Sequence, residues 1–217
     1  MLRKYSEYII LLSIYLFIIF FSNISYFIMP NDIDMDIITE NYCNNITTEY
    51  NELLNINNIN YNSSLNLNIS KVMYRDIYDY NNYIAIYKGS NDNLVKNMAV
   101  INEFGLVGII DKVNKNNSIV KLITNIDSNI SVKINNNFGI LKVSNNKLIV
   151  SDISNYNDIN IGDKIYTSGL GNVMGDLYVG EVSDISLNST NIEKIITVKS
   201  NVDFNNIKYI AVVKWLI

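Results

Sequence analysis

From Leu65 to the C-terminus, the sequence is built from short segments in which apolar and polar residues alternate. Such alternation is typical of β-strands that bury one face, and asparagine, glycine and aspartate gather between the segments as turns require. No segment in this region has the period of a helix that could cross between parallel strands, so we expect antiparallel sheets. The fold class predicted for this region is therefore mainly β, with about a dozen strands forming small barrels or a sandwich.

The predicted strands are Val72–Tyr74, Tyr83–Tyr87, Met98–Ile101, Leu106–Val113, Ser118–Ile123, Asn129–Ile134, Phe138–Val143, Lys147–Ser151, Asp163–Ser168, Leu177–Ser186, Glu193–Lys199 and Lys208–Leu216.

A second feature is the stretch Tyr8–Met29, which carries no charged side chain. An apolar helix of about 20 residues spans a bilayer core, and this stretch is long enough. Arg3 and Lys4 precede it and several aspartates follow it, which places the N-terminus in the cytoplasm and the bulk of the chain outside. We predict an uncleaved, single-pass membrane anchor. A cleaved signal peptide is the alternative, although its apolar core usually has only about 7–15 residues.

Between these regions, apolar residues recur every three or four positions, which describes one face of a helix. Asparagine is frequent here and is a mediocre helix former, so we predict that a second copy of the chain buries this stripe in a short coiled coil. A helix packed on its own domain is the alternative. The stripe comprises Ile38, Tyr42, Ile46, Tyr50, Leu53 and Ile56.

These patterns predict three regions. Residues 1–30 form the cytoplasmic N-terminus and anchor, residues 31–64 form the coiled-coil helix, and residues 65–217 form an all-β extracytoplasmic region with two subdomains and boundaries near 125 and 182.

Composition excludes several classes of function. The chain has a net charge of −4 and a pI of about 4.8, which disfavours nucleic-acid binding. It contains no histidine, so histidine-based catalysis and histidine metal sites are absent, and its single cysteine, Cys43, rules out an internal disulfide framework. We expect no catalytic residue, no cofactor and no metal site.

Two glycine-bearing stretches carry recognisable motifs. Residues 72–76 read V-M-Y-R-D, residues 84–89 read I-A-I-Y-K-G and residues 162–171 read G-D-K-I-Y-T-S-G-L-G. With these motifs, the region from Val72 onward resembles MreC, the rod-shape-determining family of bacterial cell-wall elongation. The first motif resembles the family's V-[IV]-x-R-[DN] opening, with Met73 in place of the isoleucine or valine, and the other two match its I-x-I-x-K-G and G-D-x-[VI]-x-T-S-G-L-G. The residues taken from these and neighbouring motifs as structural or interaction sites are Arg75, Asp76, Gly89, Met98, Val100, Gly105, Leu106, Gly108, Gly162, Asp163, Thr167, Ser168, Gly169, Leu170, Gly171 and Gly180.

The sequence also departs from the family pattern. Ile77 replaces a common proline, and the stretch Met174–Leu177 lacks the proline of the family's F-P-x-G-L and is one residue shorter. The conformation of the loop after Gly171 is therefore left open.

The resemblance implies two small antiparallel barrels in a dimeric, non-enzymatic scaffold on the outer face of the cytoplasmic membrane. The partners it implies are an MreD-type membrane protein, the cytoplasmic MreB system and a peptidoglycan transpeptidase/transglycosylase pair. Two alternatives remain. One is a transport adaptor of the membrane-fusion type, which inserts a helical hairpin between two halves of its β region. The other is an extracytoplasmic hydrolase that pairs Ser168 with a lysine.

Overall fold

The computed structural model describes residues 12–20, 35–62, 65–75, 82–171 and 173–214. The chain divides into two compact units, residues 1–48 and residues 49–217. Residues 12–20 are helical and belong to the first unit, and helix α2 (Met35–Asn62) begins in the first unit and ends in the second. All strands belong to the second unit.

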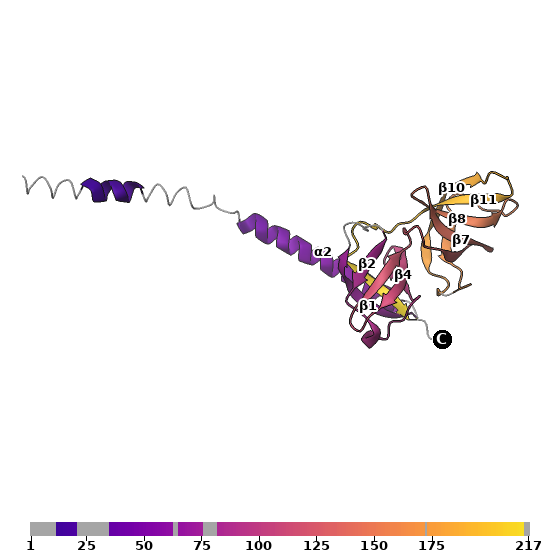
Figure 1. Ribbon diagram of the computed structural model, residues 1–217, viewed down its shortest axis with the longest axis horizontal. Coiled ribbons are helices and arrows are strands. Elements are labelled where there is room, and N and C mark those ends of the chain that lie inside the picture. The colour runs from indigo at the N-terminus through magenta and orange to yellow at the C-terminus, as the bar shows by residue number, and fades with distance from the viewer. Residues whose placement is uncertain (1–11, 21–34, 63–64, 76–81, 172, 215–217) are drawn as a thin grey trace, which may run out of the picture. The chain divides into compact units, whose positions relative to one another are not determined.

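The prediction of a mainly β fold is confirmed, and every predicted strand overlaps an observed one (Figure 1). The strands are β1 (Asn66–Arg75), β2 (Tyr83–Ile86), β3 (Ala99–Asn102), β4 (Gly105–Val113), β5 (Ser118–Leu122), β6 (Ile130–Ile134), β7 (Asn137–Ser144), β8 (Lys147–Ser154), β9 (Lys164–Thr167), β10 (Tyr178–Leu187), β11 (Glu193–Lys199) and β12 (Tyr209–Lys214). A short 3₁₀ helix, η1 (Ser90–Asp92), follows β2.

The strands form two closed barrels in which neighbouring strands are antiparallel. The first has the order β1-β12-β3-β4-β5-β2 and the second the order β10-β11-β8-β7-β6-β9. Strand β12 pairs with β1 and β3, so the second barrel is inserted in the sequence between β5 and β12. Residue 125 lies between β5 and β6, whereas residue 182 lies inside β10.

The barrels enclose two apolar clusters. Alternate residues of β6, Ile130, Val132 and Ile134, are fully buried, as a half-buried strand requires. The larger cluster combines such residues of the second barrel with Ala99 and Leu106 of the first. The smaller cluster lies within the first barrel, and the half-buried Phe204 packs against both. The two barrels therefore share part of one core.

Two motif glycines lie where strands approach too closely for a side chain. A Cβ atom at Gly108 would lie 2.3 Å from the Lys121 carbonyl oxygen, and one at Gly180 would lie 2.4 Å from the Lys199 carbonyl oxygen. Both glycines are next to register shifts in their strands, where small barrels bend. These motif positions are explained by barrel closure.

The last turns of α2 pack on the first barrel. Ile56 is buried in the larger cluster. The Glu49 carboxylate accepts hydrogen bonds from the Lys71 ammonium at 3.4 Å and from the Tyr209 hydroxyl at 3.2 Å. Glu52 lies 3.9 Å from the Lys208 ammonium. The alternative of a helix packed on its own domain therefore describes this end of α2.

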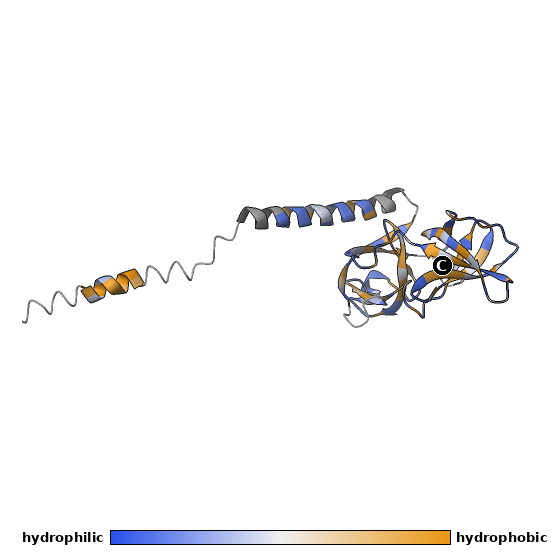
Figure 2. Cartoon of the chain, turned by 90° about the horizontal axis from the view of Figure 1, so that it is seen from above, coloured by the Kyte–Doolittle hydropathy of each residue, from blue (hydrophilic) through white to orange (hydrophobic). Residues whose placement is uncertain are grey.

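The rest of the predicted stripe is exposed. Tyr42, Ile46 and Tyr50 are 66%, 50% and 60% exposed, and Leu53 is 36% exposed. In Figure 2 the described part of α2 is mostly hydrophilic. The side chain of Ile38 lies outside the described residues. A coiled coil stays a prediction.

The predicted anchor falls largely outside the described residues. Of Tyr8–Met29, the structure describes residues 12–20, which are helical and hydrophobic (Figure 2). Among the residues that the structure describes, no helix combines the length and the apolar character needed to cross a bilayer. The anchor, too, stays a prediction.

Glu103, in the turn between β3 and β4, provides a test of how α2 packs. One of its carboxylate oxygens is buried without a hydrogen-bond partner. Burial raises the pKa of Glu103 and the Glu52 charge raises it further, while a hydrogen bond from Asn55 opposes the shift. A raised pKa in the folded state favours folding at low pH, and this contribution is lost as the pH rises through that pKa.

We therefore expect Glu103→Gln to increase the free energy of unfolding near neutral pH and to leave it unchanged well below pH 4.5, the ordinary pKa of the group. Urea unfolding at the two pH values measures this. Asp184→Asn, at an exposed position of β10, is the control and should show no such dependence. Equal effects of both variants would contradict the assignment.

Candidate interaction surface

The Gly162–Asp163 turn leads into β9 and is held against β10. The Gly162 amide donates to the Val182 carbonyl at 2.8 Å, and the Val182 amide donates to the Asp163 carbonyl at 2.9 Å. The Asp163 carboxylate accepts from the Asn160 amide at 2.9 Å and from the Asn135 side chain at 3.0 Å. Gly162 has a φ of +92°, which glycine adopts without strain. This motif pair fixes a turn.

Thr167 closes the loop that follows β9. Its buried hydroxyl donates to the Met174 carbonyl at 2.6 Å and accepts from the Leu177 amide at 2.9 Å. The two ends of the loop are thereby held together from inside. The shortened stretch is thus joined to Thr167 at Met174 and at Leu177, while residue 172 lies outside the described residues. Gly169 and Gly175 pack backbone to backbone, since a Cβ on Gly169 would lie only 3.4 Å from the Gly175 Cα.

Ser168 and its neighbours present an apolar side chain to solvent. The Ser168 hydroxyl donates to the Ser131 hydroxyl oxygen at 2.7 Å and accepts from the Leu170 amide at 3.0 Å. Gly169 and Gly171, on either side of Leu170, have φ values of +76° and +140°. Leu170 is 60% exposed at this turn. The motif therefore forms a turn that exposes a leucine.

Beside this loop, four neighbouring strands of the second barrel carry a row of large side chains on the outer face. In the strand register, Lys133 of β6 lies opposite Phe138 of β7 and opposite Tyr166 of β9. Tyr166 in turn lies opposite Tyr178 of β10. Cross-strand partners share one face of a sheet, and the alternate residues of β6 point inward. We call Phe138, Lys133, Tyr166 and Tyr178 the aromatic row.

The aromatic row has a defined geometry. The rings of Tyr166 and Tyr178 meet edge to face, with centroids 5.8 Å apart. The Lys133 ammonium lies 2.6 Å from the Asp176 carboxylate. A cavity of about 520 Å³ next to the row is lined by Lys133, Asp163 and Tyr166, among others. Phe138 is 52% exposed at the end of the row. Aromatic side chains in such positions are typical of protein–protein contacts.

Tyr178 also links the row to the first barrel. Gly105, with a φ of +142°, lies so close that a Cβ there would be 2.9 Å from the Tyr178 carbonyl oxygen. Gly105 therefore permits the contact between β4 and β10.

Burial raises the pKa of Tyr178, and the Glu181 carboxylate, which accepts a hydrogen bond from its hydroxyl at 3.4 Å, raises it further.

The remaining motif residues support the first barrel. Arg75 donates from Nη1 to the Phe204 carbonyl, and a Cβ at Gly89 would lie 2.3 Å from the Asn114 carbonyl oxygen. Hydrogen bonds from the Lys88 ammonium at 2.8 Å and the Gly89 amide at 3.0 Å lower the pKa of Asp92. Val100 and Leu106 are fully buried, and Met98 packs against the cluster that contains Val100. Asp76 lies outside the described residues.

The family model "Rod shape-determining protein MreC, barrel core" matches residues 72–214. The chain belongs to the MreC family. The cell shape-determining protein MreC of Streptococcus pneumoniae (strain ATCC BAA-255 / R6) is 34% identical over 140 residues, which cover 60% of this chain and 52% of the relative. The chain spans about half the length of the curated relatives it matches. The resemblance to MreC expected from the sequence is thus confirmed.

Solved MreC structures share the fold. A structure of the major periplasmic domain from the cell shape-determining filament MreC is 31% identical, with a TM-score of 0.62, and covers 69% of this chain and 95% of that one. A complex between penicillin-binding protein PBP2 and MreC from Helicobacter pylori matches at 20% identity and a TM-score of 0.57, covering 70% of this chain and 99% of that one. At this identity the likeness concerns the fold.

The sequence motifs predict the MreC motif residues as sites, but they do not indicate the aromatic row. Its members fall on four separate strands, so only the register brings them together. The signal available was the outward position of each residue in an alternating strand. Within the described part of the chain, no group of three acidic or cysteine side chains is placed to hold a metal ion.

We expect Thr167→Val to lower the free energy of unfolding by about 1–3 kcal/mol, because the buried Leu177 amide and the partly buried Met174 carbonyl lose their partner. Amide hydrogen exchange at Leu177 should accelerate. Thr167→Ser keeps the hydroxyl and is the control. If Val and Ser variants were equally stable, the hydroxyl would not hold the loop.

Proposed function

We propose that this chain is a non-enzymatic scaffold of the cell-wall elongation machinery that maintains cell shape. The observation that carries the proposal is the match of both barrels, from residue 72 to 214, to the MreC barrel core. Relatives with that core are named cell shape-determining proteins. In this proposal residues 1–30 anchor the chain in the cell membrane, residues 31–64 form the coiled-coil helix, and the barrels lie outside.

A peptidoglycan synthase is the proposed partner of the barrels. The Helicobacter pylori family member forms a complex with a penicillin-binding protein, which supports a partner of the same class here. The aromatic row and the exposed Leu170 offer that partner a surface, because tyrosine and phenylalanine contribute large contact area at little entropic cost. The MreD-type membrane protein and the MreB system are the further partners proposed for the membrane and cytoplasmic side.

A homodimer is proposed through α2. Tyr42, Ile46 and Tyr50 form an exposed stripe on α2, and Leu53 and Leu54 are exposed further along the helix. A second copy of the stripe would remove these side chains from water.

The alternatives are less well supported. The hydrogen bonds of the Ser168 hydroxyl go to Ser131 and Leu170, and within the described residues no lysine is among its partners. Helix α2 precedes every strand, and in the described residues no helical hairpin interrupts the β region as a membrane-fusion adaptor requires.

Depletion of the chain in its native bacterium tests the scaffold directly. We expect loss of normal cell shape, restored by the wild-type chain and by Ser168→Ala. Crosslinking from the restored cells should recover a penicillin-binding protein. Normal shape after depletion, with no wall-synthesis protein recovered, would refute the scaffold.

In the same cells, we expect the double variant Phe138→Ala, Tyr166→Ala to reduce that recovery about ten-fold or more, as loss of central aromatic contacts does. Tyr156→Ala is the matched control, because Tyr156 is 95% exposed on the same barrel but outside the aromatic row. Equal recovery with the double variant and with the control would show that the aromatic row is not part of the interface. The scaffold function would not be affected by that result.

The stripe has its own test. We expect Ile46→Glu with Tyr50→Glu to convert the dimer of the purified chain into a monomer, because charges would be buried between the helices. Light scattering measures the mass. Asn44→Glu with Asn51→Glu, at exposed polar positions of the same helix, is the control and should stay dimeric. An unchanged mass in the stripe variant would reject this dimer.

A further inference from the structure

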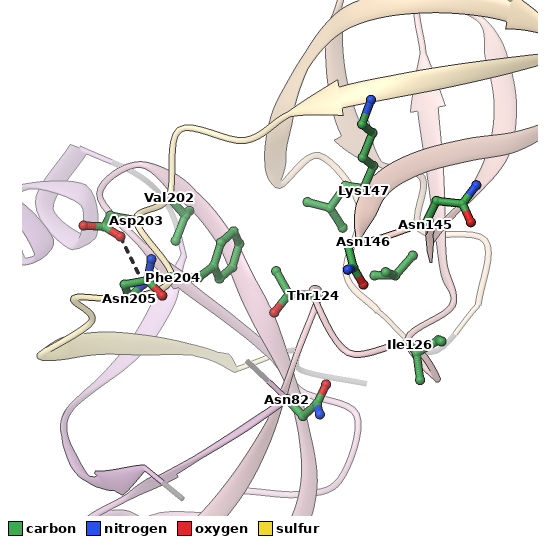
Figure 3. A pocket seen from close by; sticks show the side chains of 12 residues that line it. Asn82, Thr124, Ile126, Asn145, Asn146, Lys147, Val202, Asp203, Phe204 and Asn205 are labelled. Atoms are coloured by element: carbon green, nitrogen blue, oxygen red, sulfur yellow. Dashed lines mark hydrogen bonds between the residues drawn. The ribbon is translucent and has the colours of Figure 1, made fainter. Parts of the chain in front are cut away.

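A groove lies between the two barrels within the second unit (Figure 3). It consists of two adjoining cavities of about 860 Å³ and 500 Å³, which share Thr124, Asn146, Lys147 and Phe204 as lining residues. Volumes of this size suit a segment of several residues rather than a single ion or water. We call this the inter-barrel groove and define it by Thr124, Ile126, Asn146, Lys147, Lys199 and Phe204.

The groove combines an apolar floor with amide groups. In Figure 3, Phe204 and Thr124 from one side and Asn146 from the other face the same space. Asn145 and Asn146 form the two-residue turn between β7 and β8, and their φ values of 49° and 58° are those of such a turn. The turn thus holds an asparagine side chain at the groove, where its amide can pair with the backbone of a bound segment.

The charges at the groove are unequal. Lys147 and Lys199 are exposed, and neither makes an ion pair with a described residue. Of the carboxylates, only Asp203 lines the groove, and it accepts a hydrogen bond from the Asn205 amide at 3.0 Å, toward which it is turned in Figure 3. Glu181 is the ladder partner of Lys199 but does not line either cavity. The lining therefore carries two lysines against one aspartate, which favours an anionic occupant.

Closure of the barrels limits how a polypeptide can bind. Both barrels are closed, so neither offers a free strand edge for a partner to extend. An extended segment must instead lie between the barrels. There, side-chain amides would supply the hydrogen bonds that a neighbouring strand supplies in a sheet. Alternating apolar and acidic residues would match the floor of the groove and its two lysines.

We propose that the inter-barrel groove binds an extended acidic segment of a partner protein. The proposal rests on the scaffold function in one respect, since it assumes that this chain's role is to hold partners. The groove is distinct from the aromatic row, because no residue of the row lines either cavity. The two surfaces can therefore be tested separately.

The test uses the whole chain, purified in detergent, and fluorescent peptides of equal length in which valine alternates with glutamate, glutamine or lysine. We expect saturable binding of the glutamate peptide, followed by anisotropy, and binding about ten-fold or more weaker for the other two. Lys147→Glu with Lys199→Glu should weaken glutamate-peptide binding about ten-fold or more. Asn146→Gly should weaken it several-fold, because glycine keeps the turn and removes the amide.

Lys112→Glu with Lys115→Glu is the matched control. Both lysines are exposed on the first barrel, neither lines the groove, and the change in net charge is the same. The control should bind the glutamate peptide like the wild type. Equal binding of all three peptides, no saturable binding, or equal loss in control and groove variants would overturn the proposal. If the groove fails while the chain still restores cell shape, the scaffold function stands without it.

Discussion

The return of β12 to the first barrel is the constraint on which the rest of the β region depends. Strand β12 lies between β1 and β3 and closes the first barrel, whose other strands all precede the second barrel in the sequence. The second barrel is therefore an insertion, tied to the first by two connections, after β5 and after β11. Phe204, in the second connection, packs on both clusters, and Arg75 of β1 binds its carbonyl. The connection is thus part of the core.

Backbone proximity explains several glycines of the motifs that identify the family. Gly108 and Gly180 lie where a side chain would collide with a neighbouring strand, and Gly105 permits the contact with Tyr178 across the barrels. Thr167 holds a loop closed from inside. These residues hold the strands and the loop in their positions. What remains exposed around them, Leu170 and the aromatic row, is available to partners.

Local patterns in the sequence predicted the strands well, because each strand's alternation is contained in a few residues. The motif residues followed from a resemblance, and the structure supplies their physical reasons. The pairing of β1 with β12 could not be predicted from local patterns, since those strands are separated by the whole second barrel. The aromatic row and the inter-barrel groove depend on such pairings and were missed. The helical stripe was seen, but Ile56 packs on the barrel while Tyr42, Ile46 and Tyr50 remain exposed.

We expect the nested topology to couple the two barrels into one cooperative folding unit. Native-state hydrogen exchange at increasing denaturant tests it most directly, by comparing the slowest amides of β12 in the first barrel with those of β8 and β11 in the second. If the barrels unfold together, the amides of β12 and those of β8 and β11 exchange through one global opening, with the same free energy and the same dependence on denaturant. Exchange of β8 and β11 through a separate opening of lower free energy, while β12 stays protected, would contradict it.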